Sequence, residues 1–394
     1  RECWRLTTRS GRTIVATDNH PFLKVGGWTP LSELEVGDRI AVPREVPVFG
    51  ECDWSSERIR LLAYFIAEGG LTGRMPRFTN ADPVIVDDFE RCVYEEFESC
   101  AVTNIGITYT VRYIGDRFRG CNDVTAWLKS LELMGKSALE KRFPDVVWTF
   151  SREQLVDFVR VVMSCDGTVY PLRGYARIEF AVASENLARD MHHALIRLGI
   201  VSKFWFKKER CWRVEITEPA SVDRYQREIG WLGEKTQRRF SERPGGRALR
   251  SNIGAPPAEV WELVRKALDN AGMSFAELSR RCGENSSNPH TRRSLPQRRL
   301  AMYAEVLDDD DLRFLAKPDL YWDEVVSIGY DGERDVYDLT VPMGSNFIAD
   351  DICVHNSSLL SDFALAAGKR TQPVVLFSLE MSRQEVVQRF LSSE

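Results

Sequence analysis

The sequence of 394 residues lacks the features that mark membrane, secreted and zinc-bound proteins. It has no apolar run of about eighteen residues and no signal-peptide pattern at its N-terminus, so neither a membrane span nor secretion is predicted. Its nine cysteines form no CxxC pair and no His/Cys cluster with zinc spacing, which argues against a disulfide framework and a structural metal site. These absences predict a protein of the reducing cytoplasm with no membrane partner.

A strongly basic balance is also missing, because the formal net charge is −5. Any binding of nucleic acid must therefore come from local basic patches rather than from the total charge. The chain also lacks a start methionine and opens at Arg1. We therefore expect a segment that precedes it.

The composition that is present is ordinary for a globular protein, and the length predicts two or three domains. Residues 1–48 alternate between apolar and polar positions and are broken by glycine turns, which is typical of a compact all-β unit. Short strand patterns return at residues 324–328, 336–341 and 346–349. We therefore expect one β domain that is interrupted by an inserted domain.

A helical pattern occurs twice within the expected insertion. Residues 56–70 and 151–167 each carry an apolar stripe with helical spacing, and each ends in an acid followed by a glycine. Strand-like stretches and a second helix, such as 185–198, follow, so we interpret the region as an internal duplication. Residues 203–250 interleave Lys and Arg with aromatics, and residues 257–307 have the pattern of a helix-turn-helix.

The string His355-Asn356-Ser357 carries a self-cleaving chemistry. An asparagine amide can attack its own following peptide bond and form a succinimide, provided that the backbone holds the attack geometry and the leaving group is protonated. A preceding histidine is placed to supply that proton, and a following serine offers a hydroxyl as acyl acceptor. By itself such a string is most often a surface turn, so its context decides.

The stretch from Val336 to Asn356 resembles the C-terminal splicing blocks of inteins, and Thr17-Asp18-Asn19-His20 after a strand resembles their Thr-x-x-His block. Several matched blocks in the right order make coincidence an inadequate explanation. The resemblance implies roles in activation of the N-terminal scissile amide (Thr17, His20), coordination of the steps (Asp338), C-terminal cleavage (His355, Asn356) and acyl acceptance (Ser357).

Two departures from the intein pattern limit this expectation. Ser345 stands where many inteins carry a further histidine, which leaves the assisting role at that position open. The family's first block, with its Cys or Ser nucleophile, is absent, and Cys3 lies too close to Thr17 to replace it. We therefore expect that the chain begins inside the intein, that it cleaves at most at Asn356, and that splicing needs the missing N-terminal intein and host segment as a partner.

The two acid-ending helices resemble the LAGLIDADG helices of homing endonucleases. In that family the helices pack together and bring their terminal acids, here Glu68 and Asp166, to one seam. The resemblance implies that these carboxylates hold Mg²⁺, which activates water and stabilises the leaving oxygen of a phosphodiester. Glu68 replaces the commoner Asp. Lys141, in a basic-x-x-Pro element, is a candidate catalytic base or phosphate contact, with simple surface solvation as the alternative.

The same resemblance implies a double-stranded DNA homing site as partner, with basic residues on phosphates and side chains in the major groove. Two alternatives stay open: residues 257–307 form a solvated helical insertion, and the endonuclease is decayed and acts only as a DNA-binding or inert insertion. The DNA-binding candidates are Lys207, Lys208, Arg280, Arg281, Arg292, Arg293, Arg298 and Arg299.

The stretch after Asn356, with Phe377 to Ser382 as its specific part, resembles a bacterial replicative DNA helicase of the DnaB type just past its P-loop lysine. The resemblance implies that Ser357 binds Mg-ATP in the spliced host and that Glu380 orients the attacking water. It also implies a hexameric host. The P-loop Gly-Lys is absent, so the chain alone is not expected to hydrolyse ATP. A helicase fragment as the whole interpretation leaves the duplication unexplained.

The sequence thus predicts a multidomain α+β protein. An all-β splicing domain of the Hedgehog/intein type is split by an α+β LAGLIDADG endonuclease with a helical helix-turn-helix-like insertion, and a short α/β helicase piece follows. The expected domains are the N-terminal splicing part at 1–54, the endonuclease at 55–250, the helical region at 251–318, the C-terminal splicing part at 319–356 and the helicase piece at 357–394.

Overall fold

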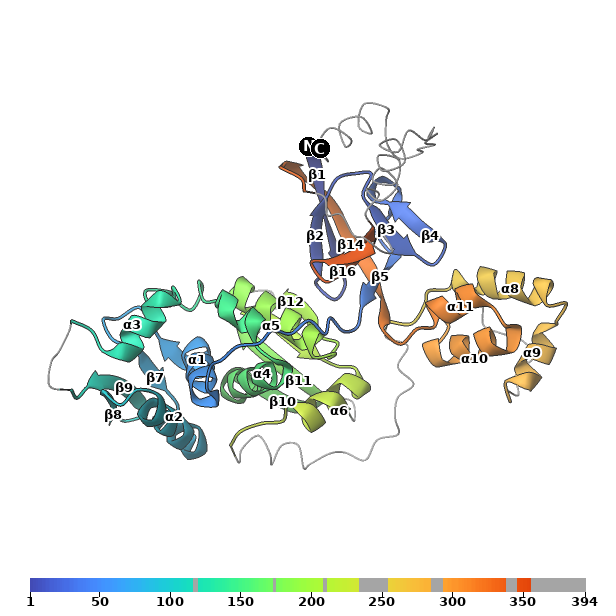
Figure 1. Ribbon diagram of the computed structural model, residues 1–394. Helices are drawn as coiled ribbons and strands as arrows, with labels where there is room; N and C mark the ends of the chain where they lie inside the picture. The colour runs from blue at the N-terminus through green and yellow to red at the C-terminus, as the bar shows by residue number, and fades with distance from the viewer. Residues whose placement is uncertain are drawn as a thin grey trace, which may run out of the picture. The chain divides into compact units, whose positions relative to one another are not determined.

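The computed structural model divides into two compact units, Arg1–Arg44 with Asn252–Glu394 and Glu45–Ser251 (Figure 1). Helices and strands are mixed, and every strand pair that is described is antiparallel. No helix in the described part is long and apolar enough to cross a membrane. The structure describes residues 1–115, 120–172, 175–207, 211–233, 254–284, 293–337 and 346–355.

The first sheet of the first unit joins the two ends of the described chain. Its strands are β1 (Glu2–Thr8), β2 (Thr13–Ala16), β5 (Arg39–Pro43) and β14 (Leu320–Glu333), in the order β2-β1-β14-β5. Strand β1 pairs with β14 from Glu2 opposite Glu333 to Thr8 opposite Val325. This pairing explains why the strand pattern of the N-terminal region returns after residue 320.

The second sheet of this unit has the order β15-β16-β3-β4. Its strands are β3 (Pro21–Lys24), β4 (Gly27–Pro30), β15 (Asn346–Ala349) and β16 (Ile352–His355). A short 3-10 helix (Leu31–Glu33) and a turn precede β5, so residues 34–38 are not part of a strand. The turn needs Gly37, whose φ is +105°, a region that disfavours other residues.

The helical part of the first unit packs around an apolar core that it shares with residues of β3, β5 and β14. It contains α8 (Val260–Asn270), α9 (Phe275–Arg281), α10 (Gln297–Leu307) and α11 (Asp310–Leu315). Ser274 caps α9 by accepting a hydrogen bond from the backbone N–H of Glu277 at 3.3 Å. Trp261, Leu278 and Tyr303 are buried in this core. Residues 285–292, between α9 and α10, lie outside the described residues.

The second unit repeats one order of elements twice, which confirms the predicted duplication. Each half runs helix, two strands, helix, two strands, helix, and the two sheets have the equivalent orders β6-β7-β9-β8 and β10-β11-β13-β12. The first half consists of α1 (Ser56–Glu68), β6 (Gly69–Gly70), β7 (Arg77–Thr79), α2 (Pro83–Glu96), β8 (Cys100–Ile105), β9 (Thr108–Tyr113) and α3 (Asp123–Ser130). After the 3-10 helix Asp145–Thr149, the second half consists of α4 (Arg152–Asp166), β10 (Gly167–Leu172), β11 (Tyr175–Val182), α5 (Glu185–Arg197), β12 (Lys203–Lys207), β13 (Cys211–Ile216) and α6 (Pro219–Glu228).

Helices α1 and α4 pack against each other at the centre of this unit (Figure 1). Ser55 and Ser151 cap their N-termini, and Ser151 forms a capping box with Gln154. The residues from Leu61 to Ile66 are all fully buried, so α1 is enclosed on every side rather than on one stripe. Burial of each large side chain of this kind stabilises the fold by about 2 kcal/mol.

Candidate functional site

The ends of α1 and α4 bring two acids and two glycines into equivalent positions. Glu68 and Asp166 are the last helical residues, and Gly69 and Gly167 follow them. A Cβ on Gly69 would lie 2.2 Å from the backbone oxygen of Phe65, and one on Gly167 would lie 2.3 Å from the corresponding oxygen of Met163. The glycine after each acid is therefore a steric requirement of a chain that leaves its helix straight into a strand.

Lys141 supports the end of α1 from inside the unit. Its Nζ donates hydrogen bonds to the backbone oxygens of Phe65 at 3.1 Å, Ile66 at 2.9 Å and Ala67 at 3.4 Å. A cation at a helix C-terminus is favourable because the carbonyls there carry partial negative charge. Only 6% of Lys141 is exposed, so the alternative of a solvated surface lysine is wrong.

The charges at this seam perturb one another. Burial raises the pKa of Glu68 to about 7, and the hydrogen bond from Asn80 at 2.6 Å opposes this shift, as does Lys141, while the charge of Asp166 adds to it. Burial also raises the pKa of Asp166 to about 6, against the attraction of Lys141. The pKa of Lys141 falls to about 8 through burial, although both carboxylates favour its charged form. The seam therefore holds two acids and one base that all titrate near neutrality.

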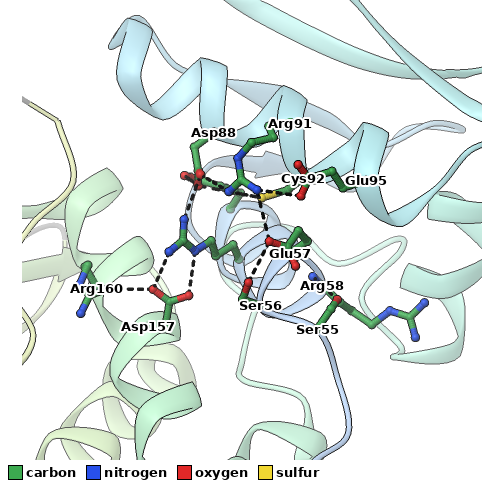
Figure 2. Close-up of polar contacts among 12 residues, drawn as sticks. Ser55, Ser56, Glu57, Arg58, Asp88, Arg91, Cys92, Glu95, Asp157 and Arg160 are labelled. Atoms are coloured by element: carbon green, nitrogen blue, oxygen red, sulfur yellow. Dashed lines mark hydrogen bonds and ion pairs between the residues drawn. The ribbon is translucent and has the colours of Figure 1, made fainter.

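A second polar cluster joins the N-terminal halves of the same helices (Figure 2). Arg60 of α1 donates to both carboxylate oxygens of Asp157 of α4, at 2.8 and 3.2 Å, and to Asp88 of α2 at 3.0 Å. Burial raises the pKa of Asp88, but hydrogen bonds from Tyr64 and Arg91 more than offset it and leave the pKa below its usual value. Figure 2 shows Asp88 and Asp157 facing one guanidinium, which ties three helices together.

In the first unit, the turn of the Thr-x-x-His block leads directly into β3. The backbone N–H of His20 donates to the oxygen of Thr17 at 3.1 Å, and the Thr17 hydroxyl donates to Asn19 Oδ1 at 2.7 Å. The oxygen of His20 accepts from the backbone N–H of Leu31 at 2.9 Å. Thr17 and His20 thus sit in one closed turn whose geometry is set by backbone bonds.

Strand pairing brings this turn to the C-terminal histidine. Val354 of β16 lies opposite Phe22 of β3, so in an antiparallel pair the residues before Phe22 run beside those after Val354. His355 therefore approaches the segment that begins with His20. The structure brings together the two ends of the block pattern that the sequence separates.

Trp28 contacts His355 and was not identified from the sequence. The two ring centroids are 4.9 Å apart, and the rings are tilted by 58°. Nδ1 of His355 is buried and has no hydrogen-bond partner among the described residues. The Gly26-Gly27 turn and the following strand were recognisable, but the contact depends on the pairing of β16 with β3, which no local pattern gives.

The predicted basic residues are placed differently from one another. Lys207 is exposed at the end of β12, and Arg293 and Arg298 are also exposed. Arg280 and Arg281 both pair with Glu277 in α9, and Arg299 pairs with Glu284. The remaining predicted site residues lie outside the described residues, namely Lys208, Arg292, Asp338, Ser345, Asn356, Ser357 and Glu380.

Residues 1–356 match the family model described as the intein splicing domain. The chain belongs to the intein splicing family. It is similar to proteins named replicative DNA helicase DnaB from Rhodothermus marinus (31% identity over 376 residues, 90% of this chain and 40% of the relative) and from Nostoc sp. (30% over 373 residues, 89% and 42%). It is also similar to the protein named RecA from Mycobacterium tuberculosis (25% over 392 residues, 90% and 49%). The intein chain thus spans less than half the length of these relatives.

Among solved structures, the homing endonuclease I-DmoI in complex with DNA and Mn aligns with the intein chain at 12% identity and a TM-score of 0.32. The alignment covers 44% of this chain and 96% of that one. The N-terminal LAGLIDADG domain of DUF199/WhiA aligns at 16% identity with the same TM-score and covers 48% of this chain and 87% of that one.

Proposed function

We propose that the intein cleaves the Asn356–Ser357 bond and takes part in splicing of a DnaB-type replicative helicase precursor, with a LAGLIDADG homing endonuclease nested in it. The observation that supports the splicing part is the pairing of β16 with β3 at Val354 and Phe22, because in an antiparallel pair the chain after Val354 runs beside the chain before Phe22. In this proposal the two sheets of the first unit form the all-β splicing domain of Hedgehog/intein type, and α9 and α10 form the helix-turn-helix region.

C-terminal cleavage follows from the order of three residues. The side-chain nitrogen of Asn356 loses a proton and attacks the backbone carbonyl carbon of the same residue. The bond from that carbon to the Ser357 nitrogen breaks, and a succinimide remains on the intein. The leaving nitrogen takes up a proton, which His355 supplies as general acid. The Ser357 hydroxyl is the acyl acceptor in the splicing sequence, Thr17 and His20 polarise the N-terminal scissile amide, and Asp338 coordinates the steps.

The test of this part is release of the peptide 357–394 from the purified chain, followed by mass. The expected result is a slow release that Asn356→Ala abolishes. Asn346→Ala is the matched control, because Asn346 is exposed on β15 opposite His355 and takes no part in the bond rearrangement. Release that continues in Asn356→Ala contradicts the mechanism.

For the endonuclease, the proposal rests on the paired ends of α1 and α4. Two carboxylates offer the hard oxygen donors that Mg²⁺ prefers, and Mg²⁺ commonly takes only one or two carboxylates besides water and phosphate oxygens. Glu68 and Asp166 fit this donor set, although no group of three or more His, Cys, Asp or Glu suited to a metal exists among the described residues. A bound Mg²⁺ supplies activation of water and stabilisation of the leaving oxygen. Lys141 holds the end of α1 and so positions Glu68.

Cleavage of a duplex that carries the uninterrupted host site, with Mg²⁺ present, tests this part. Glu68→Ala and Asp166→Ala are expected to abolish cleavage, and Asp87→Asn, an exposed acid on α2, is the matched control. A wild-type chain that binds the duplex without cutting it supports the alternative of a decayed endonuclease that only binds DNA.

The host part of the proposal concerns the spliced product. There Ser357 binds Mg-ATP through the hydroxyl that accepted the acyl group, and Glu380 orients the attacking water. The product is a hexameric, cytoplasmic helicase, and ATP is its cofactor only after splicing. Mass detection of the ligated host sequence together with ATPase activity tests this part.

A further inference from the structure

The outer faces of the two sheets in the second unit differ at equivalent positions. The pairings Gly69–Phe78 and Gly167–Phe180 follow equivalent helix ends, so one step further along each pair Arg77 corresponds to Glu179. Arg77 lies opposite Thr110, whereas Glu179 lies opposite Glu215. The duplication therefore places an arginine and a threonine on one sheet where the other carries two glutamates.

Two like charges directly opposite each other destabilise a sheet unless they are compensated. Arg213 donates to Glu179 at 2.6 Å, and Arg177 donates to Glu215 at 2.9 Å. The Tyr170 hydroxyl lies 3.3 Å from Glu179 and 3.2 Å from Glu215, and burial together with these two carboxylates raises the pKa of Tyr170 to about 12. Tyr170 and these two arginines and two glutamates form one hydrogen-bond network with no net charge.

Both arginines of this face of the sheet are engaged within this network. The side chains of Glu179 and Glu215 are only 9% and 12% exposed, so the carboxylates lie at the base of the face and hold the guanidiniums down. Arg77, by contrast, is exposed and has no ion-pair partner among the described residues. The buried side of each sheet carries the core residues Phe78 and Phe180, which leaves these charged residues on the opposite side.

We infer that Glu179 and Glu215 are specificity-determining residues that withhold Arg177 and Arg213 from the phosphates of duplex DNA. This inference rests on the proposed endonuclease function. Each phosphate that a protein neutralises adds about 0.9 to the slope of affinity against salt, without regard to sequence. The first sheet supplies such phosphate contacts through Arg77. The second sheet binds DNA strongly only where base edges replace the partners that these arginines and glutamates have within the network, since arginine pairs with guanine and glutamate accepts from cytosine.

The experiment measures binding to a duplex of arbitrary sequence and to the duplex of the uninterrupted host site, between about 50 and 200 mM salt. In Glu179→Gln and Glu215→Gln, the side-chain size and one acceptor oxygen are kept, so the sheet is retained. Affinity for the arbitrary duplex is expected to rise about threefold to tenfold, with a salt slope steeper by about one and a smaller ratio of specific to arbitrary binding. Arg77→Gln is expected to lower the affinity for both duplexes by the same factor.

Glu185→Gln is the matched control, because it makes the same charge change and breaks the Arg189 pair on α5, on the helical side of the sheet. If the control raises affinity as much as Glu179→Gln, the effect is one of net charge and the inference is overturned. An unchanged salt slope in both sheet variants overturns it too, while wild-type binding persists and the endonuclease proposal stands. A wild-type chain that binds neither duplex defeats the proposed function itself.

Discussion

The seam of α1 and α4 and the β3–β16 junction bring their side chains together by opposite means. Glu68 and Asp166 end two capped helices within one compact unit, and each is fixed by its own helix and by the glycine that follows. His20 and His355 come from segments far apart in the chain, and these segments run side by side only because β16 pairs with β3. A helix end therefore tolerates distant changes, whereas the junction depends on long-range register.

The largest expected effect is on the junction. His355→Ala removes the general acid of our proposal and is expected to slow release of residues 357–394 by about 10²-fold or more. Asp166→Asn, at the seam, is expected to leave that rate unchanged. The measurement is the time course of peptide mass for both variants. Slower peptide release in Asp166→Asn contradicts the independence of the two sites.

At the seam, the largest effect is expected from Lys141→Met. This change leaves two carboxylates and three helix carbonyls without their cation, and breaking a buried pair in this way costs about 3 kcal/mol. Urea unfolding of the second unit, followed by tryptophan fluorescence, measures the loss. Lys136→Met, an exposed lysine five residues earlier, is the control, and an equal loss there refutes a special role for Lys141.

Trp28 is the next residue that tests the β3–β16 junction. Its ring lies 4.9 Å from that of His355 between centroids, so loss of the contact leaves the imidazole less firmly positioned. Trp28→Ala is expected to slow peptide release about tenfold, and Trp28→Phe, which keeps an aromatic ring, to restore part of the rate. The measurement is the time course of peptide mass. A Trp28→Ala variant that releases the peptide as fast as the wild type contradicts a positioning role for Trp28.

A smaller effect is expected from Asp166→Asn on stability in a chelating buffer. The pKa of Asp166 in the folded state, about 6, lies above the ordinary value of 3.8. The folded state therefore binds the proton more tightly, so the wild type loses stability as the pH rises from about 4 through 6. The variant is expected to gain about 1 kcal/mol at pH 8 and nothing near pH 4, and a gain that is the same at both values contradicts the assignment.

The smallest effect is expected at the Arg60–Asp157 bridge between the same helices (Figure 2). Both side chains are partly exposed, so a double-mutant cycle with Arg60→Leu and Asp157→Leu is expected to give a coupling of about 1 kcal/mol. The Arg189–Glu185 pair on one face of α5 is the control and should give about 0.3 kcal/mol. If the coupling free energy of Arg60 and Asp157 is no larger than that of the control pair, their ion pair does not hold the helices together.

Local patterns predicted the parts of the fold that local physics determines. The helices ending at Glu68 and Asp166 and the duplication are confirmed, because caps, apolar spacing and acid–glycine ends are encoded within each segment. Within residues 1–48, where the pattern indicated strands and glycine turns, Leu31–Glu33 form a 3-10 helix that was not predicted.

The contacts that were missed all depend on pairing between distant segments. The bonds of Lys141 to the end of α1, the ring contact of Trp28 with His355, and the Glu179–Glu215 opposition follow from tertiary packing and strand register. Neither spacing nor residue type fixes these, since a one-residue slip in register would send each side chain to the other face.

The β1–β14 pairing also sets the order of events during folding. Closing a loop between Glu2 and Glu333 costs chain entropy that grows with the length of flexible chain between them. When residues 45–251 have already folded as their own unit, much of that flexible length is gone and the closure is cheaper. The sheet that carries the first strand should therefore form late, after the inserted unit has folded.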